Sequence, residues 1–375
     1  MTVNRCEVAV VGGGLSGCSA AISLARAGVD VALFEAGRLP RHRVCGEFLS
    51  PESRATLKRL GAAELMAQSG ARSVQGARFC CGALHADFDL GNAPGLALSR
   101  FSLDPLLWQV AESAGVGGFL EAKVRDFHSE NDEFHFEANG QSWSAQTVIY
   151  AAGRAAAPRP PSDKTPRFCG LKAHFADVDL ESGVVEMHLF RGGYCGLVRV
   201  EGQATNACLM VDTRHFPKTS PDEFWAQLLT QIPALRARFE RAMRVAPWSA
   251  TAAVSFDQFR PTDSVNDDTG PNGVLYAGDA AGYIHPLTGD GMAMALRAGE
   301  LAATVARLQV RGLNAAEAAR LYDAAWRREF APRLRLAARL HPLALRPHWA
   351  KPLTPLVQRL PALKAAWTRG TRGAL

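Results

Sequence analysis

The chain of 375 residues predicts a two-domain α/β protein with a helical segment at its C-terminus. Three observations support this fold class. A strand–turn–helix–strand pattern fills residues 6–35, strand-like segments predominate between residues 167 and 257, and an Ala-, Leu- and Arg-rich helical pattern begins at residue 314. With 47% hydrophobic and 21% charged residues, the composition is that of a globular protein long enough for a large core.

A glycine-rich turn follows the first apolar strand, residues 6–11. Its spacing is G-x-G-x-x-G, and it opens an apolar helix that continues to about Arg26. We expect Gly12 to permit the tight turn, Gly14 to let a pyrophosphate approach the backbone, and Gly17 to let helix and strand pack closely. The free N–H groups and the positive dipole end of this helix are suited to hold the diphosphate.

A second strand, residues 30–34, ends at an acid, Glu35. Its carboxylate is placed to accept hydrogen bonds from the ribose hydroxyls of an adenosine. A glycine-rich turn alone is a weak indicator. With both strands and the terminal acid present, the pattern predicts a Rossmann-type dinucleotide-binding unit.

A second glycine-bearing turn follows the strand that ends at Gly278-Asp279 and leads into a helix to about Val310. An acid at a strand end can accept a hydrogen bond from the ribityl hydroxyl of FAD. The N–H groups of residues 289–292, at the start of the helix, can stabilise negative charge on a reduced flavin.

These motifs resemble one family of flavoproteins. The turn at 12–17, Glu35 and the loop Cys45-Gly46-Glu47 are similar to the geranylgeranyl reductase branch of the proteins with the p-hydroxybenzoate hydroxylase fold. The 278–292 segment is similar to that family's G-D-A-A-G…P…G-x-G-M/I element. The resemblance implies non-covalently bound FAD and places the Cys-Gly-Glu loop beside the isoalloxazine ring.

The same resemblance assigns further contacts to the cofactor. The Arg100-x-x-x-Asp104 spacing resembles an element in which the Arg approaches the cofactor, and we interpret Asp104 as an acid at a helix start. The adenine is expected near Lys123 and Val124. The predicted cofactor-binding set is Gly12, Gly14, Leu15, Ser16, Gly17, Glu35, Ala36, Arg43, Cys45, Gly46, Arg100, Val124, Gly278, Asp279, Gly289, Gly291 and Met292.

The electron donor is expected to be NAD(P)H or a separate reductase. The strand at 147–151 ends in Ala152-Gly153, whereas NAD(P)H-dependent aromatic hydroxylases of this family usually carry Asp-Gly at the corresponding turn. This departure disfavours tight use of NADPH in the manner of those hydroxylases.

The middle of the chain predicts an inserted mixed or antiparallel β-sheet that forms one wall of a substrate cavity. A helical insert is expected at 221–243. The family's Gly-Tyr-x-Trp strand is represented by Gly193–Leu197, without its Trp and final Pro, and the elements required by flavin halogenases are absent from the sequence. In this part of the chain, strands are expected at 168–177, 184–190, 194–200, 204–212 and 250–256. Earlier in the chain we expect a single helix at 52–68 and strands over 73–98, 118–127, 133–138 and 146–151.

The domains are expected to interleave along the chain. Residues 158–166 are Pro-rich and read as a linker. The FAD-binding domain comprises residues 1–72, 98–157 and 262–310, the substrate domain comprises residues 73–97 and 158–261, and residues 311–375 form a basic helical segment.

Four side chains are candidate catalytic groups. His285, one residue before Pro286, is expected at the flavin edge as a proton donor or base, or as a polar residue that orients the loop. Cys45 is either a packed thiol or a redox or substrate-gating group. Glu47 and Tyr194 are the other candidates facing the cavity.

The predicted function is redox chemistry on a lipophilic small molecule of isoprenoid or polyketide type, free or carrier-bound. Monooxygenation through an FAD hydroperoxide is favoured slightly, because monooxygenases are common across the fold. Reduction of a C=C bond is the alternative that the Cys-Gly-Glu loop and the Ala152-Gly153 turn support. A flavin-binding module without catalysis is the alternative of another class, and the retention of both glycine turns argues against it.

The C-terminal segment concentrates positive charge. No acid follows Glu329, and nine Lys and Arg residues do, so the net charge of +6 leaves 6 − 9 = −3 for the rest of the chain. Prolines at 342, 347, 352, 355 and 361 are expected to cut this tail into short pieces. Its apolar faces either cap the substrate domain or rest on anionic lipid or an acidic carrier protein.

The composition also sets bounds on partners and compartment. No nucleic-acid motif, leader-like N-terminus or run of eighteen apolar residues occurs, and the eight cysteines show no metal-binding spacing. We therefore expect a cytoplasmic protein, with peripheral membrane contact as the alternative, free thiols, and no bound metal or nucleic acid.

Overall fold

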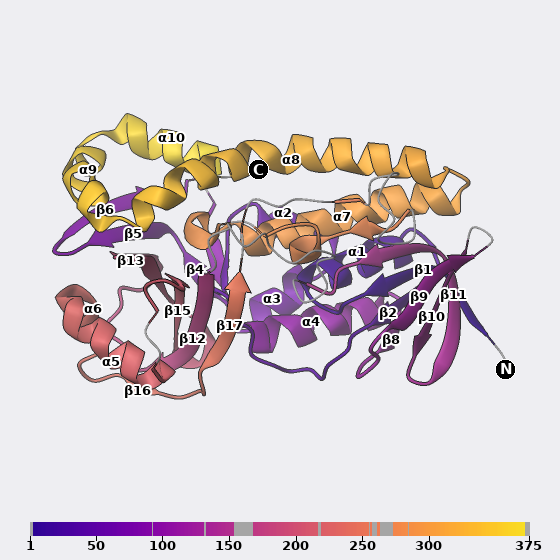
Figure 1. The fold of residues 1–375 in the computed structure, drawn as a ribbon, viewed down its shortest axis with the longest axis horizontal. Helices are drawn as coiled ribbons and strands as arrows, with labels where there is room; N and C mark the ends of the chain where they lie inside the picture. Colours follow the sequence, from indigo (N-terminus) through magenta and orange to yellow (C-terminus); the bar gives the residue numbers. More distant parts are fainter. Residues whose placement is uncertain are drawn as a thin grey trace.

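The structure is a computed structural model that describes residues 3–91, 93–130, 133–153, 168–216, 219–254, 256, 261–262, 273–283 and 285–371. The expected linker at 158–166 lies outside these residues. The described part is an α/β fold in which a nucleotide-binding type of sheet lies at one end of the molecule and a second sheet at the other (Figure 1). Long helices from the C-terminal third run along both.

The first sheet has the strand order β8-β2-β1-β11-β10-β9, with β18 paired to β11. Strands β2, β1, β11 and β18 are parallel, and their last residues are in register: Val11 pairs with Phe34 and Tyr150, and Tyr150 pairs with Tyr276. The segments that follow these strands therefore emerge at one edge of the sheet, where open α/β sheets bind ligands. The strands are β1 (Asn4–Val11), β2 (Val31–Phe34), β8 (Gly117–Phe119), β9 (Arg125–Glu130), β10 (Glu133–Ala138), β11 (Gln141–Tyr150) and β18 (Leu275–Tyr276).

Helices α1 (Leu15–Ala25) and α7 (Gly291–Val310) pack against each other although nearly 280 residues separate their starts. The approach is close because Gly299 has no side chain: a Cβ there would overlap the carbonyl oxygen of Ser16. Helix α4 (Arg100–Ser113) also contacts α1, and α8 (Ala315–Ala344) lies along α7 (Figure 1). The Tyr322 hydroxyl of α8 donates to the carbonyl of Tyr276, 2.8 Å away, which ties α8 to the sheet.

The second sheet has the order β16-β12-β15-β14-β13-β5-β6, with β17 paired to β12. All pairings except the parallel β5–β13 pair are antiparallel, so the sheet is mixed, as expected. One face packs on α5 and α6 through an apolar cluster, and the other faces the first domain. The elements are β5 (Gly76–Cys81), β6 (Leu84–Asp89), β12 (Phe168–Ala176), β13 (Val184–Phe190), β14 (Gly193–Arg199), β15 (Thr205–Asp212), β16 (Met243–Arg244), β17 (Ser249–Val254), α5 (Pro221–Gln231) and α6 (Pro233–Arg238).

A small third sheet, two short α-helices and three 3-10 helices are also present in the described residues. The sheet has the order β3-β7-β4, and its strands fall between residues 48 and 97. These elements are β3 (Phe48–Leu49), β4 (Arg72–Val74), β7 (Gly95–Ala97), α2 (Ser53–Arg59), α3 (Ala63–Gln68) and the 3-10 helices at Glu201–Gln203, Gly278–Ala280 and Pro286–Thr288.

Three expected elements are each divided in two. The single helix expected at 52–68 is broken at Gly61, whose φ of +71° is left-handed. The helical insert is broken before Pro233, which cannot donate a backbone hydrogen bond, and ends in β16 rather than continuing as helix. The strand expected at 118–127 becomes β8 and β9, with left-handed Glu121 between them.

The prolines of the C-terminal segment do not cut it as expected. Pro342 lies inside α8, and Pro352 and Pro355 lie inside α9 (Pro347–Arg359). Only Pro347 and Pro361 mark boundaries, at the first positions of α9 and α10 (Pro361–Thr371), where the missing N–H has no helical partner. Of the helices in the described ranges, none has the length and apolar character needed to cross a membrane.

Candidate cofactor and substrate site

A cavity of about 750 Å³ opens at the edge where the parallel strands of the first sheet end. It is lined by segments that are far apart in the sequence: the glycine-rich turn, the 41–48 loop, the ends of β2 and β11, residues 249–251 of β17, and the 278–295 segment. Every residue of the predicted cofactor-binding set except Gly17 lines it. Gly17 instead lies against the Gly12 carbonyl oxygen, which a Cβ would overlap.

The glycine-rich turn leaves the cavity side of α1 open. Gly12 has a φ of +110°, and a Cβ there would overlap the Ala151 carbonyl, so only glycine fits. A Cβ on Gly14 would have Arg100 as its nearest neighbour, 3.7 Å away. The first turn of α1 carries no acid or side-chain cap, and Ser16 Oγ is buried without a hydrogen-bond partner in the described structure. Such a helix start, with unpaired donors, is suited to a diphosphate.

Glu35 is a buried carboxylate at the cavity rim. It accepts hydrogen bonds from the backbone N–H groups of Gly13 and Gly37, at 3.0 and 2.8 Å. Its Oε1 also lies 2.6 Å from a guanidinium nitrogen of Arg41, and Arg43 lies 3.6 Å from Oε2. These partners fix the acid at the end of β2, where a dinucleotide ribose would reach it.

The Arg100 guanidinium approaches the glycine-rich turn and is braced from behind. Asp104 is buried and accepts two hydrogen bonds from Arg100, at 2.6 and 2.9 Å. Burial lowers the pKa of Arg100, but the Asp104 carboxylate outweighs this effect and raises it. The interpretation of Asp104 as a helix-start acid is wrong: the N-cap is Ser99, whose hydroxyl accepts from the N–H of Ser102.

The second glycine-bearing segment is in contact with the first. Gly278 has a φ of +64°, and a Cβ there would lie 2.9 Å from that of Ser16. Gly289 has a φ of +72°, and a Cβ there would lie 2.9 Å from the ring of Phe48. The two predicted cofactor-binding turns, which are far apart in the sequence, therefore border one cavity.

Glu47, the last residue of the Cys-Gly-Glu loop, has three hydrogen-bonding partners. It is fully buried and has a φ of +55°, a strained conformation for a residue with a side chain. Its carboxylate accepts from the Arg100 N–H at 2.8 Å and from the Lys172 ammonium, and His174 Nε2 lies 2.6 Å away. A buried acid with three hydrogen-bonding partners, from a backbone N–H, a lysine and a histidine, holds the loop in place in the cavity.

Cys45 lies in the same loop and keeps part of its surface open. The Asn206 amide of β15 donates to the Cys45 carbonyl at 3.0 Å, which joins the loop to the second sheet. Burial raises the pKa of the Cys45 thiol, while the nearby charge of Arg100 acts in the opposite direction. The thiol is therefore protonated at neutral pH. Burial, with the charges of Lys172 and His174, also lowers the pKa of His42, another cavity residue.

Lys172 and His174 were missed by the reasoning from sequence. They occupy alternate positions of β12, and the intervening residues, Leu171 and Ala173, face the apolar cluster under α5 and α6. A strand that carries two charged side chains two residues apart in an otherwise apolar run already indicates one polar, buried face. That pattern was the available signal.

Two of the four candidate catalytic residues do not reach the cavity. Cys45 and Glu47 line it, whereas His285 and Tyr194 lie behind its wall. The His285 ring is 4.2 Å from that of Phe256 and 4.0 Å from that of His341, in the contact between α8 and the second sheet. Tyr194 is buried in the apolar cluster that contains Phe256, and burial raises the pKa of its hydroxyl.

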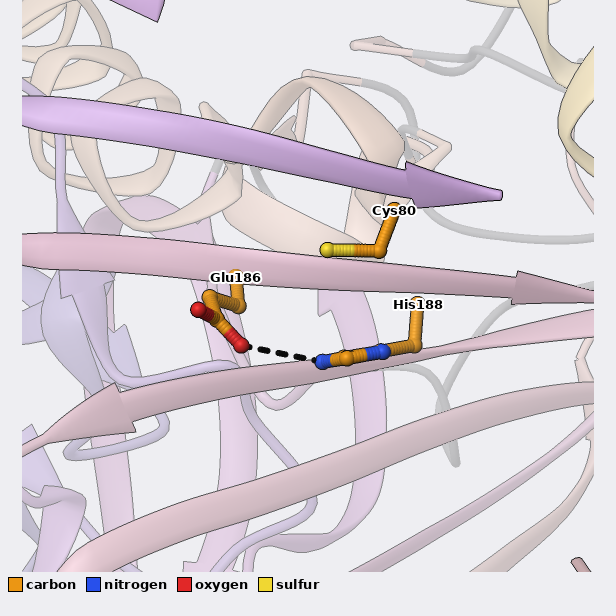
Figure 2. Close-up of side chains that lie close together, drawn as sticks. All are labelled: Cys80, Glu186 and His188. Atoms are coloured by element: carbon orange, nitrogen blue, oxygen red, sulfur yellow. Dashed lines mark hydrogen bonds and ion pairs between the residues drawn. The ribbon is translucent and has the colours of Figure 1, made fainter. Parts of the chain in front are cut away.

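A second charged cluster lies on β5 and β13, outside the cavity (Figure 2). Cys80, Glu186 and His188 have ligand-type atoms within 4.8 Å of one another. However, Arg238 donates two hydrogen bonds to Glu186, at 2.8 and 3.1 Å, and Arg78 lies 3.4 Å from it. A cation here would meet two guanidinium groups, and burial raises the pKa of the Cys80 thiol to about 12. We interpret the cluster as a structural ion-pair network.

Comparison with known proteins supports an FAD site. The model of an FAD binding domain matches residues 5–159. A menaquinone reductase from Mycolicibacterium smegmatis is 26% identical over 80% of this chain and 76% of its own length. The menaquinone reductase of Mycobacterium tuberculosis is 34% identical over 33% of this chain, and the match spans 31% of that relative's own length. A 3-amino-4-hydroxybenzoate 2-monooxygenase from Streptomyces platensis is 28% identical over 46% of both chains.

Solved structures with the same fold include enzymes of several kinds. A flavin-dependent brominase superposes with a TM-score of 0.82 at 17% identity, covering 98% of this chain and 93% of its own. A geranylgeranyl bacteriochlorophyll reductase-like protein from Thermoplasma acidophilum superposes with a TM-score of 0.79 at 19% identity, covering 98% and 96%. At these identities the likeness concerns the fold alone.

Proposed function

We propose that this chain, an FAD-dependent oxidoreductase of the p-hydroxybenzoate hydroxylase fold superfamily, reduces a C=C bond of a lipophilic isoprenoid substrate. The observation that carries the proposal is the position of the Cys45 thiol in the cavity, on the loop that the contacts of Glu47 hold, with its pKa raised by burial. The similarity to a menaquinone reductase over 80% of the chain points to the same substrate class.

The residues that line the cavity fit FAD. Glu35 would accept from its ribose, the start of α1 would hold its diphosphate, and Gly291 with Met292 at the start of α7 would face the flavin ring. When reduced, the bound cofactor would supply a hydride for one carbon of the double bond. Its electrons would come from NAD(P)H or a separate reductase.

Cys45 supplies the proton for the other carbon. Its S–H bond breaks, the new C–H bond forms, and the resulting thiolate lies in the field of the Arg100 guanidinium. Solvent returns the proton before the next turnover. A hydrogen donor fixed in place is worth about 10²–10⁴ in rate. Glu47 does not exchange protons in this scheme: it is a positioning residue whose carboxylate holds the loop.

The lining of the substrate side is compatible with a lipophilic molecule. Val44, Ala250, Tyr283 and Pro286 contribute apolar surface opposite the glycine-rich turn. A hydrophobic substrate, free or attached to a carrier, would enter between this surface and the Cys45 loop.

The decisive experiment is an anaerobic single turnover. The purified yellow protein, reduced by dithionite without O₂, is mixed with a menaquinone whose isoprenoid chain is unsaturated. The expected product is two mass units heavier and keeps the added hydrogens after exposure to air, whereas a quinol would reoxidise. Product that forms only with O₂ and contains an added oxygen atom would refute the proposal.

Variants test the role of the thiol. Cys45→Ser should retain FAD but slow the anaerobic step by roughly 10²-fold, because the hydroxyl is a poorer acid. Cys169→Ser is the matched control, since Cys169 lies on the opposite face of β12 and bonds to the Val211 carbonyl. Equal rates for the two variants would remove Cys45 from the chemistry.

Monooxygenation remains a second candidate function because of the similarity to a monooxygenase over 46% of the chain. In that case reduced protein would consume O₂ and transfer one oxygen atom to the substrate. Stopped-flow mixing with O₂ also separates both enzymes from a simple binding module, in which the reduced flavin would be inert to O₂ and to every acceptor.

A further inference from the structure

Helix α9 presents an apolar stripe to solvent. Trp349 is 53% exposed, Leu353 43%, Leu356 50% and Leu360 41%, and Leu363 of α10 continues the stripe. At 3.6 residues per turn, Trp349, Leu353 and Leu356 of α9 fall within about 60° of one another around the helix, and Leu360 follows as its C-cap residue. A row of large apolar side chains on one helix face, all facing water, is typical of an interaction surface.

The opposite face of α9 is fixed to the second sheet. Thr354 is buried, and Ala350 packs against the apolar cluster around Phe168. The Gln358 side-chain oxygen accepts from the Asp87 N–H of β6 at 2.8 Å. Figure 1 shows α9 beside β6 and β5, at the end of the molecule away from the first sheet. The helix therefore cannot turn its stripe inward without losing these contacts.

Positive charge flanks the stripe. No acid occurs after Glu329. The guanidinium of Arg346 lies 5.2 Å from the centre of the Trp349 ring, and Arg359 of α9 is exposed. A helix with Leu and Trp on one face and cations beside it is suited to the boundary between lipid headgroups and acyl chains.

We propose that α9 and α10 dock this protein on an anionic membrane surface, with the α9 stripe inserted among the lipids. An acidic protein would offer charge but would need an apolar face that matches a straight row of Leu and Trp. A bilayer supplies both without shape complementarity. This surface goes beyond the reaction proposed above and does not depend on it.

Co-sedimentation with vesicles tests the proposal. The full-length, FAD-loaded protein is incubated with vesicles of phosphatidylcholine alone or with one third phosphatidylglycerol, at low and high salt. We expect binding to the anionic vesicles that weakens with salt. Arg346→Gln and Arg359→Gln should each lower partitioning about fivefold. Leu353→Gln with Leu356→Gln should abolish it, and FAD content and circular dichroism report that each variant is folded.

Matched controls lie away from the stripe. Leu321→Gln alters another exposed leucine, 48% exposed, near the start of α8, and Lys58→Gln alters an exposed lysine of α2. Neither should change binding. A second measurement needs no variant: hydrogen exchange at residues 347–363 should slow when anionic vesicles are added.

The results that would overturn the proposal are distinct. Failure to sediment with anionic vesicles at low salt, with no change in exchange, would remove the membrane and leave an acidic protein as the partner. Binding that the Leu353 and Leu356 substitutions leave intact would place the contact elsewhere. Flavin reduction and anaerobic turnover on a dispersed substrate are measured separately, so they stand or fall independently.

Discussion

Removal of Lys172 should destabilise the protein far more than loss of a surface lysine. Its ammonium is 1% exposed and Glu47 is fully buried, so Lys172→Met leaves a buried carboxylate with one cationic partner fewer. Breaking such a pair from one side costs about 3–5 kcal/mol. The free energy of unfolding would be measured by urea denaturation followed by circular dichroism, with FAD present throughout.

A double variant separates the charge from the packing. Glu47→Gln added to Lys172→Met removes the unpaired charge while keeping the side-chain length, so most of the lost stability should return. Lys58→Met, on an exposed position of α2, is the control and should change stability by less than about 0.5 kcal/mol. If Lys172→Met costs less than about 1 kcal/mol, or the double variant is no more stable than the single one, the buried clamp does not exist as described.

Three further predictions concern other parts of the molecule. Burial raises the pKa of Glu186, but hydrogen bonds from His188 and Arg238 have the larger, opposite effect. The pKa of Glu186 is therefore lowered from an ordinary value of 4.5 to about 2. The network should therefore contribute roughly 3 kcal/mol above pH 4.5 that is lost as the pH falls toward 2; denaturation at pH 6 and pH 3 measures the difference, and an Arg238→Met variant with the same pH dependence would contradict it. Gly17→Ala should destabilise the protein by more than about 2 kcal/mol and abolish the yellow colour, because the methyl group overlaps the Gly12 carbonyl; a variant that purifies with full FAD would show that this contact is not essential. Tyr194→Phe should leave turnover within about twofold, since the hydroxyl does not line the cavity, and a hundredfold loss would return Tyr194 to the chemistry.

The nucleotide-binding half was predictable because its determinants are local. The strand before Gly12, the helix after it and the strand before Glu35 are adjacent in the chain, and parallel strands end together at one edge. The segment at Gly278 was predictable for the same reason, since its own strand and helix flank it. That these two segments border one cavity could be expected only from the resemblance to a family, because no local pattern in the sequence indicates it.

The clamp around Glu47 was not predictable in this way. Lys172 is 125 residues away in the chain, and its contact depends on the relative placement of two domains. The prediction for the C-terminal helical segment was wrong for another reason. Propensity places a boundary at each proline, but the packing of α8 along α7 and of α9 on β6 keeps Pro342, Pro352 and Pro355 inside helices.

The close approach of α7 to α1 has a consequence for biosynthesis. Ser16 contacts Gly278 and Gly299, so the binding pocket needs residues from segments that lie far apart in the polypeptide. A nascent chain on the ribosome carries its glycine-rich turn without the helix that completes the site until α7 has been synthesised. Only after residue 299 has left the exit tunnel can the flavin be captured, so loading of the coenzyme must follow the synthesis of α7.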